Sequence, residues 1–275
     1  MSRRGPYKVK DLSQHMTERD VRILLDLEQL RLLDSRTIQQ LHFPVGDGEH
    51  LTDLAAMRAC NRVLVRLAER DAIVMLSRRI GGITPGSTSI VWQLGKGGER
   101  LLRARSGRTN RRRYFEPTYA FMEHTLAVAR TLAGLVEASR DRDFEVLEYL
   151  SEPDCWRPFT SPIGPTVLKP DLYVVTADAE VEAHSFVEVD RGTEHLPTVL
   201  QKCRVYQDYW GTGRAQEELQ LFPSVVWIVP DDRRARLIRE AIERDAGLDT
   251  GLFHVTTPSG AAAVLAPSNP KGGNQ

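Results

Sequence analysis

The sequence predicts a mixed α/β protein in two parts: a basic, helical front part and an acidic back part in which helices and strands interleave. The 275 residues include 41% hydrophobic residues, enough to bury real cores. The charges divide unevenly, with 22 Lys and Arg against 12 Asp and Glu in residues 1–113, and 15 against 25 in residues 114–275. The apolar spacing changes near Pro117 from a mainly helical pattern to a mixed one. An anion-binding front part is therefore expected.

Three helices followed by a β-hairpin are predicted in the front part. Each helix starts at a capping Thr or Asp side chain, and its apolar residues recur at helical spacing. Two strand-like stretches, residues 72–79 and 87–95, flank a turn-rich segment and predict the hairpin. This order is that of a winged helix-turn-helix domain, expected over residues 12–95. The helices are predicted at residues 17–33, 35–43 and 52–71.

The third helix is the candidate DNA-recognition element. Arg58, Arg62 and Arg66 recur every four residues on a face of their own. Arginine can reach both the phosphates and the base edges of DNA. A winged helix used for protein contacts is the alternative, and the excess of basic residues argues against it. The buried stripe of this helix is predicted to be Leu54, Met57, Leu64 and Leu67.

Residues 96–113 are predicted to be a flexible basic linker, because they combine turn-forming residues with many arginines and few acids. Such a segment fits along a phosphate backbone and adds salt-dependent, sequence-independent affinity. Arg78 and Arg79, at the end of the first hairpin strand, are assigned to the same DNA surface. The DNA-contacting arginines of the linker are predicted to be Arg103, Arg105, Arg108, Arg111, Arg112 and Arg113.

The back part, residues 114–258, predicts a mixed β-sheet flanked by helices. A long helix over residues 118–139 opens it, and strand-like stretches then interleave with further helices. Residues 259–275 are expected to be a disordered tail. The strands are predicted at residues 144–150, 172–176, 184–189, 224–229 and 252–257, and the further helices at residues 195–210 and 231–244.

Carboxylates gather where two of these strands begin and end. Asp171 precedes one strand, and Glu188 and Asp190 close the next, where alternation gives them a common face. If the two strands pair, Asp171 joins them. Oxygen ligands of this kind suit Mg²⁺ or Mn²⁺, which would activate a water against a phosphodiester. Surface charge at a strand end is the plainer alternative.

This arrangement resembles the PD-(D/E)XK nuclease superfamily, which has a restriction-endonuclease-like fold. The matching residues are Pro170-Asp171 and then Glu188, whereas Asp190 stands where the motif has its lysine. Lys202 on the next helix is the expected substitute. The resemblance implies Asp171 and Glu188 as metal ligands, Asp190 as a third ligand or water-orienting group, and Lys202 as the charge stabiliser.

The chain is also similar to the replication-relaxation family of bacterial plasmids and integrative elements. The most specific stretch is residues 169–210, which contains FVEVDRGTE and a helix with Lys202 and Tyr206. The resemblance implies a DNA-binding role in relaxation, replication or mobilisation of such elements, with metal-dependent nicking if the site is active. The alternative is a non-catalytic regulator or accessory replication factor with an inactivated nuclease-like scaffold. Double-stranded DNA, replication or mobilisation proteins and a second copy of the chain are the expected partners.

Two other side chains near this site are given structural interpretations. Glu194 is expected to cap the following helix or to pair with Arg191. Tyr206 lies in an aromatic stretch with Tyr209 and Trp210, which is typical of a buried helix face rather than of a nucleophile.

The remaining composition indicates a reducing compartment. Cys60, Cys155 and Cys203 are odd in number and far apart, which favours buried thiols over a zinc site. No run of about eighteen apolar residues occurs, so no membrane partner is expected. The basic, polar start of the sequence predicts a cytoplasmic location.

Overall fold

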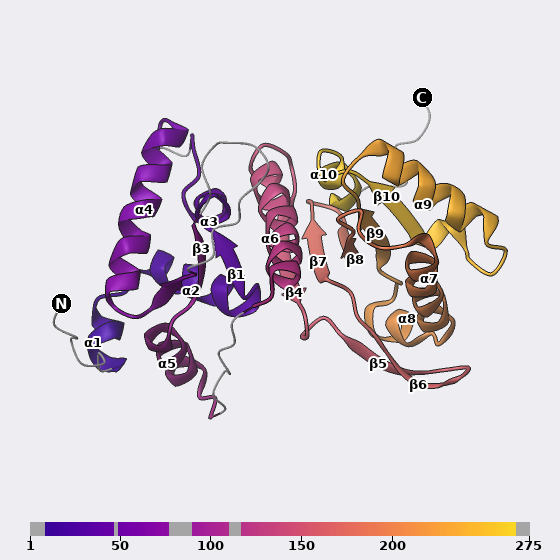
Figure 1. Cartoon of the computed structure of the whole chain (residues 1–275), viewed down its shortest axis with the longest axis horizontal. Helices are drawn as coiled ribbons and strands as arrows, with labels where there is room; N and C mark the ends of the chain where they lie inside the picture. Colours follow the sequence, from indigo (N-terminus) through magenta and orange to yellow (C-terminus); the bar gives the residue numbers. More distant parts are fainter. Residues whose placement is uncertain (1–8, 47–48, 77–89, 110–116, 268–275) are drawn as a thin grey trace. The chain divides into compact units, whose positions relative to one another are not determined.

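The computed structural model describes residues 9–46, 49–76, 90–109 and 117–267 (Figure 1). The predicted α/β class is confirmed, because helices accompany a five-stranded mixed sheet and two small antiparallel sheets. The chain divides into two compact units, residues 1–133 and 134–275, and the division falls within helix α6 (Tyr119–Arg140). The boundary expected at residue 114 lies outside the described residues.

A three-stranded antiparallel sheet in the order β1–β3–β2 lies in the front unit. β2 and β3 are the strands of the predicted hairpin, and most of the segment between them, including Arg78 and Arg79, lies outside the described residues. β1 was expected to be the end of the first helix. Arg31 has a φ of 68°, a left-handed conformation that cannot continue a helix, so the chain leaves the helix there. The strands are β1 (Leu32–Asp34), β2 (Ile73–Met75) and β3 (Val91–Leu94).

Capping side chains start the three main front helices where the sequence predicts them. Thr17 accepts a hydrogen bond from the backbone N–H of Asp20, and the Thr52 hydroxyl accepts one from Ala55. The Asp34 carboxylate likewise accepts the N–H of Thr37 at 2.8 Å. The helices are α2 (Glu18–Gln29), α3 (Ser35–His42) and α4 (Asp53–Glu69), and a short α1 (Val9–Gln14) precedes them.

The buried face of α4 differs in part from the predicted stripe. Leu64 and Leu67 are buried as expected, but Leu54 is 60% exposed and Met57 is half-buried. The small residues Ala56 and Cys60 are fully buried in their place, and the Cys60 thiol lies 3.7 Å from the carbonyl oxygen of Ser35, at the start of α3. Small side chains allow close packing of the two helices, which a search for large apolar residues does not detect.

The segment predicted as a flexible linker is largely helical, as α5 (Lys96–Ser106). Leu101 and Leu102 are buried on it, and it contacts α1 and α2. Its glycines serve close packing and not a turn, because a Cβ added to Gly98 would lie 2.3 Å from the carbonyl oxygen of Ala72. The linker interpretation is therefore wrong for this helix, while residues 110–113 lie outside the described residues.

The sheet of the back unit contains all five predicted strands, in the order β10–β9–β8–β7–β4. β8, β9 and β10 are parallel, whereas β7 runs antiparallel to both of its neighbours. This pattern places the start of β7 beside the end of β8. The strands are β4 (Glu145–Ser151), β7 (Leu172–Ala177), β8 (Glu182–Val189), β9 (Ser224–Ile228) and β10 (Phe253–Thr256).

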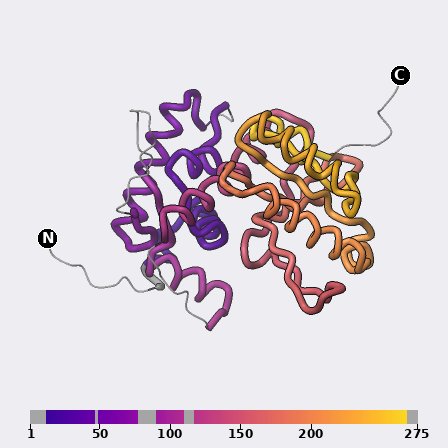
Figure 2. Tube along the Cα trace, turned by 45° about the vertical axis from the view of Figure 1, so that its right-hand side comes forward, coloured from indigo at the N-terminus to yellow at the C-terminus, as the bar shows by residue number. Residues whose placement is uncertain are grey.

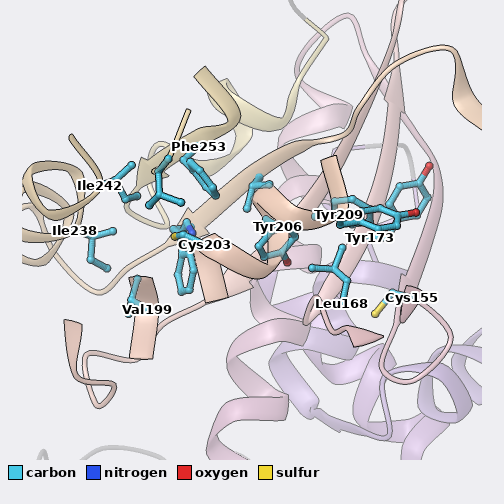
Figure 3. Close-up of a cluster of buried hydrophobic side chains, with 14 of the residues drawn as sticks. Cys155, Leu168, Tyr173, Val199, Cys203, Tyr206, Tyr209, Ile238, Ile242 and Phe253 are labelled. Atoms are coloured by element: carbon cyan, nitrogen blue, oxygen red, sulfur yellow. The ribbon is translucent and has the colours of Figure 1, made fainter. Parts of the chain in front are cut away.

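Helices α7 (Leu196–Gly211) and α9 (Asp232–Arg244) contribute side chains to one core cluster together with this sheet (Figure 3). Tyr206 of α7 and Trp227 of β9 are among its largest fully buried side chains. Figure 3 shows Tyr206 and Cys203 between Ile238 and Tyr209 in this cluster. Both predicted helices are thus confirmed, and they bring their polar residues to the sheet along with the apolar ones. The unit also contains α8 (Arg214–Leu219) and a short 3₁₀ helix (Thr250–Leu252).

Part of the expected disordered tail is ordered. Residues Ala261–Leu265 form α10, and Leu265 is buried. The Thr176 hydroxyl on β7 donates to the Leu265 carbonyl oxygen at 2.6 Å. The buried Ala261 and Leu265 side chains of this helix pack it against β9 and β10.

A β-hairpin that the sequence did not predict connects β4 to β7. Its strands β5 (Arg157–Ser161) and β6 (Gly164–Leu168) form a separate two-stranded sheet, and both contact α7. Figure 2 shows this hairpin extending from the rest of the back unit. Pro158 and Pro165 lie within its strands, and prolines argue against a strand when only the sequence is considered.

Candidate active site at the end of strands β7 and β8

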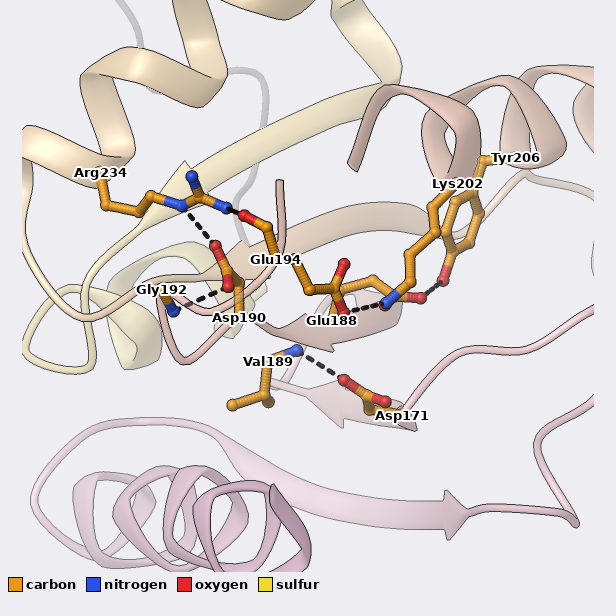
Figure 4. A network of polar contacts seen from close by, with 9 residues as sticks. All are labelled: Asp171, Glu188, Val189, Asp190, Gly192, Glu194, Lys202, Tyr206 and Arg234. Atoms are coloured by element: carbon orange, nitrogen blue, oxygen red, sulfur yellow. Dashed lines mark hydrogen bonds and ion pairs between the residues drawn. The ribbon is translucent and has the colours of Figure 1, made fainter. Parts of the chain in front are cut away.

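The predicted carboxylates lie at one end of the back-unit sheet. Asp171 directly precedes β7, and its N–H donates to the carbonyl oxygen of Val187 at 3.1 Å. One carboxylate oxygen of Asp171 accepts the N–H of Val189 at 2.7 Å. Asp171 is therefore fixed beside the end of β8, next to Glu188 (Figure 4). The two strands pair, and this pairing, which the sequence left as a condition, brings Asp171 and Glu188 to one end of the sheet.

Glu188 is buried, with 2% of its surface exposed, and α7 supplies both of its side-chain partners. Tyr206 donates its hydroxyl hydrogen to one carboxylate oxygen at 2.7 Å, and the Lys202 ammonium lies 3.1 Å from the other. These two residues are one helical turn apart, so they share a face of α7. The Lys202 side chain is 34% exposed, so the cluster meets solvent at Lys202 while Glu188 is buried. α7 thus directs Lys202 toward the carboxylates, which a substitute for the motif lysine requires.

Glu194 also belongs to this cluster, although the sequence suggested a capping or Arg191-pairing role. Its carboxylate accepts a hydrogen bond from Lys202 at 2.8 Å. The N-cap of α7 is His195, which makes no side-chain capping bond. Glu194 lies in the loop between β8 and α7, where neither strand nor helix periodicity fixes the direction of a side chain. No sequence pattern could have revealed its contact with Lys202.

The cluster has more negative than positive charge. Burial and the neighbouring Asp171 raise the pKa of Glu188 to about 8, although Lys202 and Tyr206 partly oppose this. Burial alone would lower the pKa of Lys202, but Glu188 and Glu194 outweigh it and raise the pKa, so the ammonium stays charged. Three carboxyl groups thus surround one ammonium group, an arrangement that favours an additional cation.

Asp190 does not join the other carboxylates, which corrects its prediction as a third ligand or water-orienting group. Its side chain accepts from Arg234 of α9 at 2.6 Å and from the N–H of Gly192 at 2.8 Å. Figure 4 shows the Asp190 carboxylate directed toward Arg234. The alternation of side chains holds only within a strand, and β8 ends at Val189. Across the described ranges, no three His, Cys, Asp or Glu side chains are placed to hold one metal ion.

Two oxygen donors of the predicted metal site nevertheless remain together. Asp171 and Glu188 are carboxylates, the ligands that Mg²⁺ and Mn²⁺ prefer. Mg²⁺ in proteins often takes only one or two carboxylates and completes its shell with water and substrate phosphate. The residues present therefore fit a two-carboxylate site but not the expected three-carboxylate site.

The predicted DNA-binding arginines of the front unit fall into two groups. Arg58 and Arg62 of α4 and Arg105 of α5 are exposed, and none of them forms an ion pair within the part of the chain that the structure describes. The others that the structure describes are ion-paired: Arg66 with Asp20 at 2.5 Å, Arg103 with Glu99 at 3.6 Å and Arg108 with Glu28 at 2.7 Å. Arg78, Arg79, Arg111, Arg112 and Arg113 lie outside the described residues.

All three cysteines are free and buried, as the sequence predicts. No helix in the described residues is long and apolar enough to cross a membrane.

Comparison with known proteins gives one family assignment. No curated protein and no solved structure matches the chain. The family described as replication-relaxation matches residues 24–225. This match covers most of the chain and includes α4 as well as Asp171, Glu188 and Lys202. The chain belongs to the replication-relaxation family.

Proposed function

We propose that the protein binds duplex DNA through its front unit and acts on a phosphodiester bond at the Asp171–Glu188–Lys202 site of its back unit. Membership of the replication-relaxation family supports a role in the replication or relaxation of plasmid or mobile-element DNA. The observation that carries the catalytic part is the contact of Lys202 with Glu188 at 3.1 Å, beside Asp171. Lys202 would take the place of the motif lysine, because position 190 holds an aspartate.

The order and charges of the front unit support duplex DNA as the partner. The order α2–β1–α3–α4–β2–β3 is that of a winged helix, in which the third helix commonly enters the major groove. Arg58 and Arg62 lie four residues apart on α4 and are exposed. Their guanidinium groups can reach phosphates and base edges. Arg66 contributes less, because Asp20 already neutralises it.

The chemistry of the back-unit site would be hydrolysis of a phosphodiester by water. A divalent cation held by Asp171 and Glu188, with Mg²⁺ or Mn²⁺ as the candidates, would supply Lewis acidity and lower the pKa of a bound water. Lys202 would stabilise the negative charge that develops on the phosphate. Tyr206 holds the Glu188 carboxylate in place, and Glu194 holds Lys202.

A non-catalytic scaffold is the second candidate, and a specific observation favours it. Both oxygens of Glu188 already have protein partners, and its exposure is only 2%. Asp190 replaces the motif lysine and pairs with Arg234. In this case the back unit would recruit replication or mobilisation proteins, or a second copy of the chain, to DNA bound by the front unit.

Supercoiled plasmid DNA distinguishes the two candidates. The wild type and the variants Asp171→Asn, Glu188→Gln and Lys202→Met are incubated with plasmid and Mg²⁺ or Mn²⁺, and gel shifts are recorded on the same DNA. We expect nicking by the wild type and a loss of about a hundredfold or more in each variant, with the shift retained. The control is Arg204→Ala, because Arg204 lies on the same helix in an exposed pair with Asp245. If the wild type shifts the DNA in the gel but does not nick it, the non-catalytic scaffold is the function.

A further inference from the structure

The β5–β6 hairpin has an exposed apolar tip, and its base lies near the candidate active site. Ile163 is 95% exposed, and with Pro162 it forms the two-residue connection between the paired Ser161 and Gly164. β6 leads through residues 169–170 directly to Asp171. The base of the hairpin is therefore at the sheet end that carries the candidate active site.

A proline and two hydrogen bonds constrain the backbone at the tip. Proline fixes its own φ angle. The Ser161 hydroxyl accepts the N–H of Ile163 at 3.3 Å and donates to the carbonyl oxygen of Gly164 at 3.0 Å. On the inner face, Phe159 and Leu168 are buried in the core of the unit. The side chain of Ile163 is thus held out by a supported hairpin, and little conformational entropy would be lost when it binds a partner.

The charges within the hairpin favour an anionic partner. Residues 155–170 contain two cations and no acidic residue, although Asp154 and Asp171 directly flank this segment. Arg157 lies over the ring of Tyr173, and Lys169 lies over the ring of Trp156. Arg214 donates to the Pro158 carbonyl oxygen at 2.8 Å. In the described ranges, none of these three cations has a carboxylate partner.

The hairpin is poorly suited to bind a protein by adding a strand. Pro158 and Pro165 each lack an N–H, and each lies in one of its two strands. Their side chains belong to the exposed face, together with Thr160 and Val167. An apolar tip on a β-ribbon with cations near its base is instead suited to DNA, where Ile and Pro side chains are used as wedges between base steps.

We propose that the β5–β6 hairpin is a DNA wedge, in which Ile163 inserts between base steps of duplex DNA while Arg157, Lys169 and Arg214 face its phosphates. The inference rests on the proposed function, since it requires that the protein bind duplex DNA. The kink would form at the tip of the hairpin, whose base leads to Asp171. Deformable pyrimidine–purine steps would be preferred, because they cost least to unstack.

Energy transfer between dyes at the two ends of a duplex tests the wedge. The duplex has about 30 base pairs, well below the persistence length, so it is nearly straight when free. We expect the full-length wild type to bend it by roughly 20–90° and to raise the transfer efficiency. Ile163→Ala should lose most of this rise, while its Kd should change less than about tenfold because phosphate contacts supply most of the affinity. The matched control is Leu147→Ala on β4, another apolar residue that is 50% exposed in the same unit.

Each other outcome overturns the wedge. If the wild type binds DNA without bending it, or if Ile163→Ala bends it as well as the wild type does, the wedge is wrong while the proposed DNA binding stands. If no DNA is bound, both proposals fail. If Ile163→Ala loses self-association in sedimentation experiments and still bends DNA, the tip is a contact between protein copies.

Discussion

Arg234 of α9 donates to the buried carboxylate of Asp190 at 2.6 Å, two residues beyond Glu188 in the sequence. The same guanidinium group donates to the Glu194 carbonyl oxygen at 2.6 Å, and so ties the start of α9 to the loop between β8 and α7. That loop carries Glu194, which contacts Lys202. The Asp190–Arg234 pair therefore supports the candidate site without belonging to it.

Removal of either member of this pair should destabilise the back unit. Asp190→Ala leaves Arg234, whose side chain is only 14% exposed, without its carboxylate partner. A loss of about 3 kcal/mol in the free energy of unfolding is expected. Urea unfolding followed by tryptophan fluorescence measures it. The double variant Asp190→Ala with Arg234→Met should lose less than the sum of the single variants, and simple additivity would contradict a direct pair.

Arg58 and Arg66, on the same helix, should respond differently to truncation. Arg58→Ala should reduce the slope of log Kd for DNA against log salt concentration by about 1, with unchanged stability, because its exposed guanidinium group is free for a phosphate. Arg66→Ala should lower the free energy of unfolding by about 2–3 kcal/mol, because it leaves Asp20, whose side chain is 1% exposed, buried without its cation. Fluorescence anisotropy at several salt concentrations and urea unfolding separate the two effects. Equal salt slopes for Arg58→Ala and the wild type would show that Arg58 makes no phosphate contact.

Two glycine-to-alanine substitutions should have opposite effects on stability. Gly98→Ala should destabilise the front unit, because the new Cβ would lie 2.3 Å from the backbone oxygen of Ala72. Gly134→Ala in α6 meets nothing within 4 Å, and should stabilise by about 0.5–1 kcal/mol through helix propensity. Thermal unfolding compares them. A harmless Gly98→Ala would show that α5 is not packed as described.

The three thiols should be inert in the folded protein. Burial raises the pKa of Cys60, Cys155 and Cys203 to about 12. At pH 8 only a very small fraction of each thiol is therefore the reactive thiolate, and iodoacetamide should leave the native chain essentially unmodified. Mass spectrometry should detect no adduct on the native chain and three adducts after unfolding in urea. Rapid labelling of one native cysteine would show that its surroundings open to solvent.

The elements that the sequence predicts correctly are those with a strong local signal. The cap residues Thr17, Asp34 and Thr52 start helices where expected, because the capping bond joins residues three apart. The elements that the sequence predicts wrongly are those whose local signal opposes the structure that forms. α5 contains glycines and β5 contains Pro158, and tertiary contacts outweigh the local preference of these residues.

The sequence by itself determined the α/β class, the strands that carry Asp171 and Glu188, and the helix that carries Lys202, because periodicity and capping are local properties of the chain. Only the tertiary structure decided which side chains meet. Lys202 reaches Glu188 across 14 residues, and Arg234 reaches Asp190 across 44. Such contacts depend on how α7 and α9 pack against the sheet. Periodicity specifies the face of a helix, but packing specifies which charge that face meets.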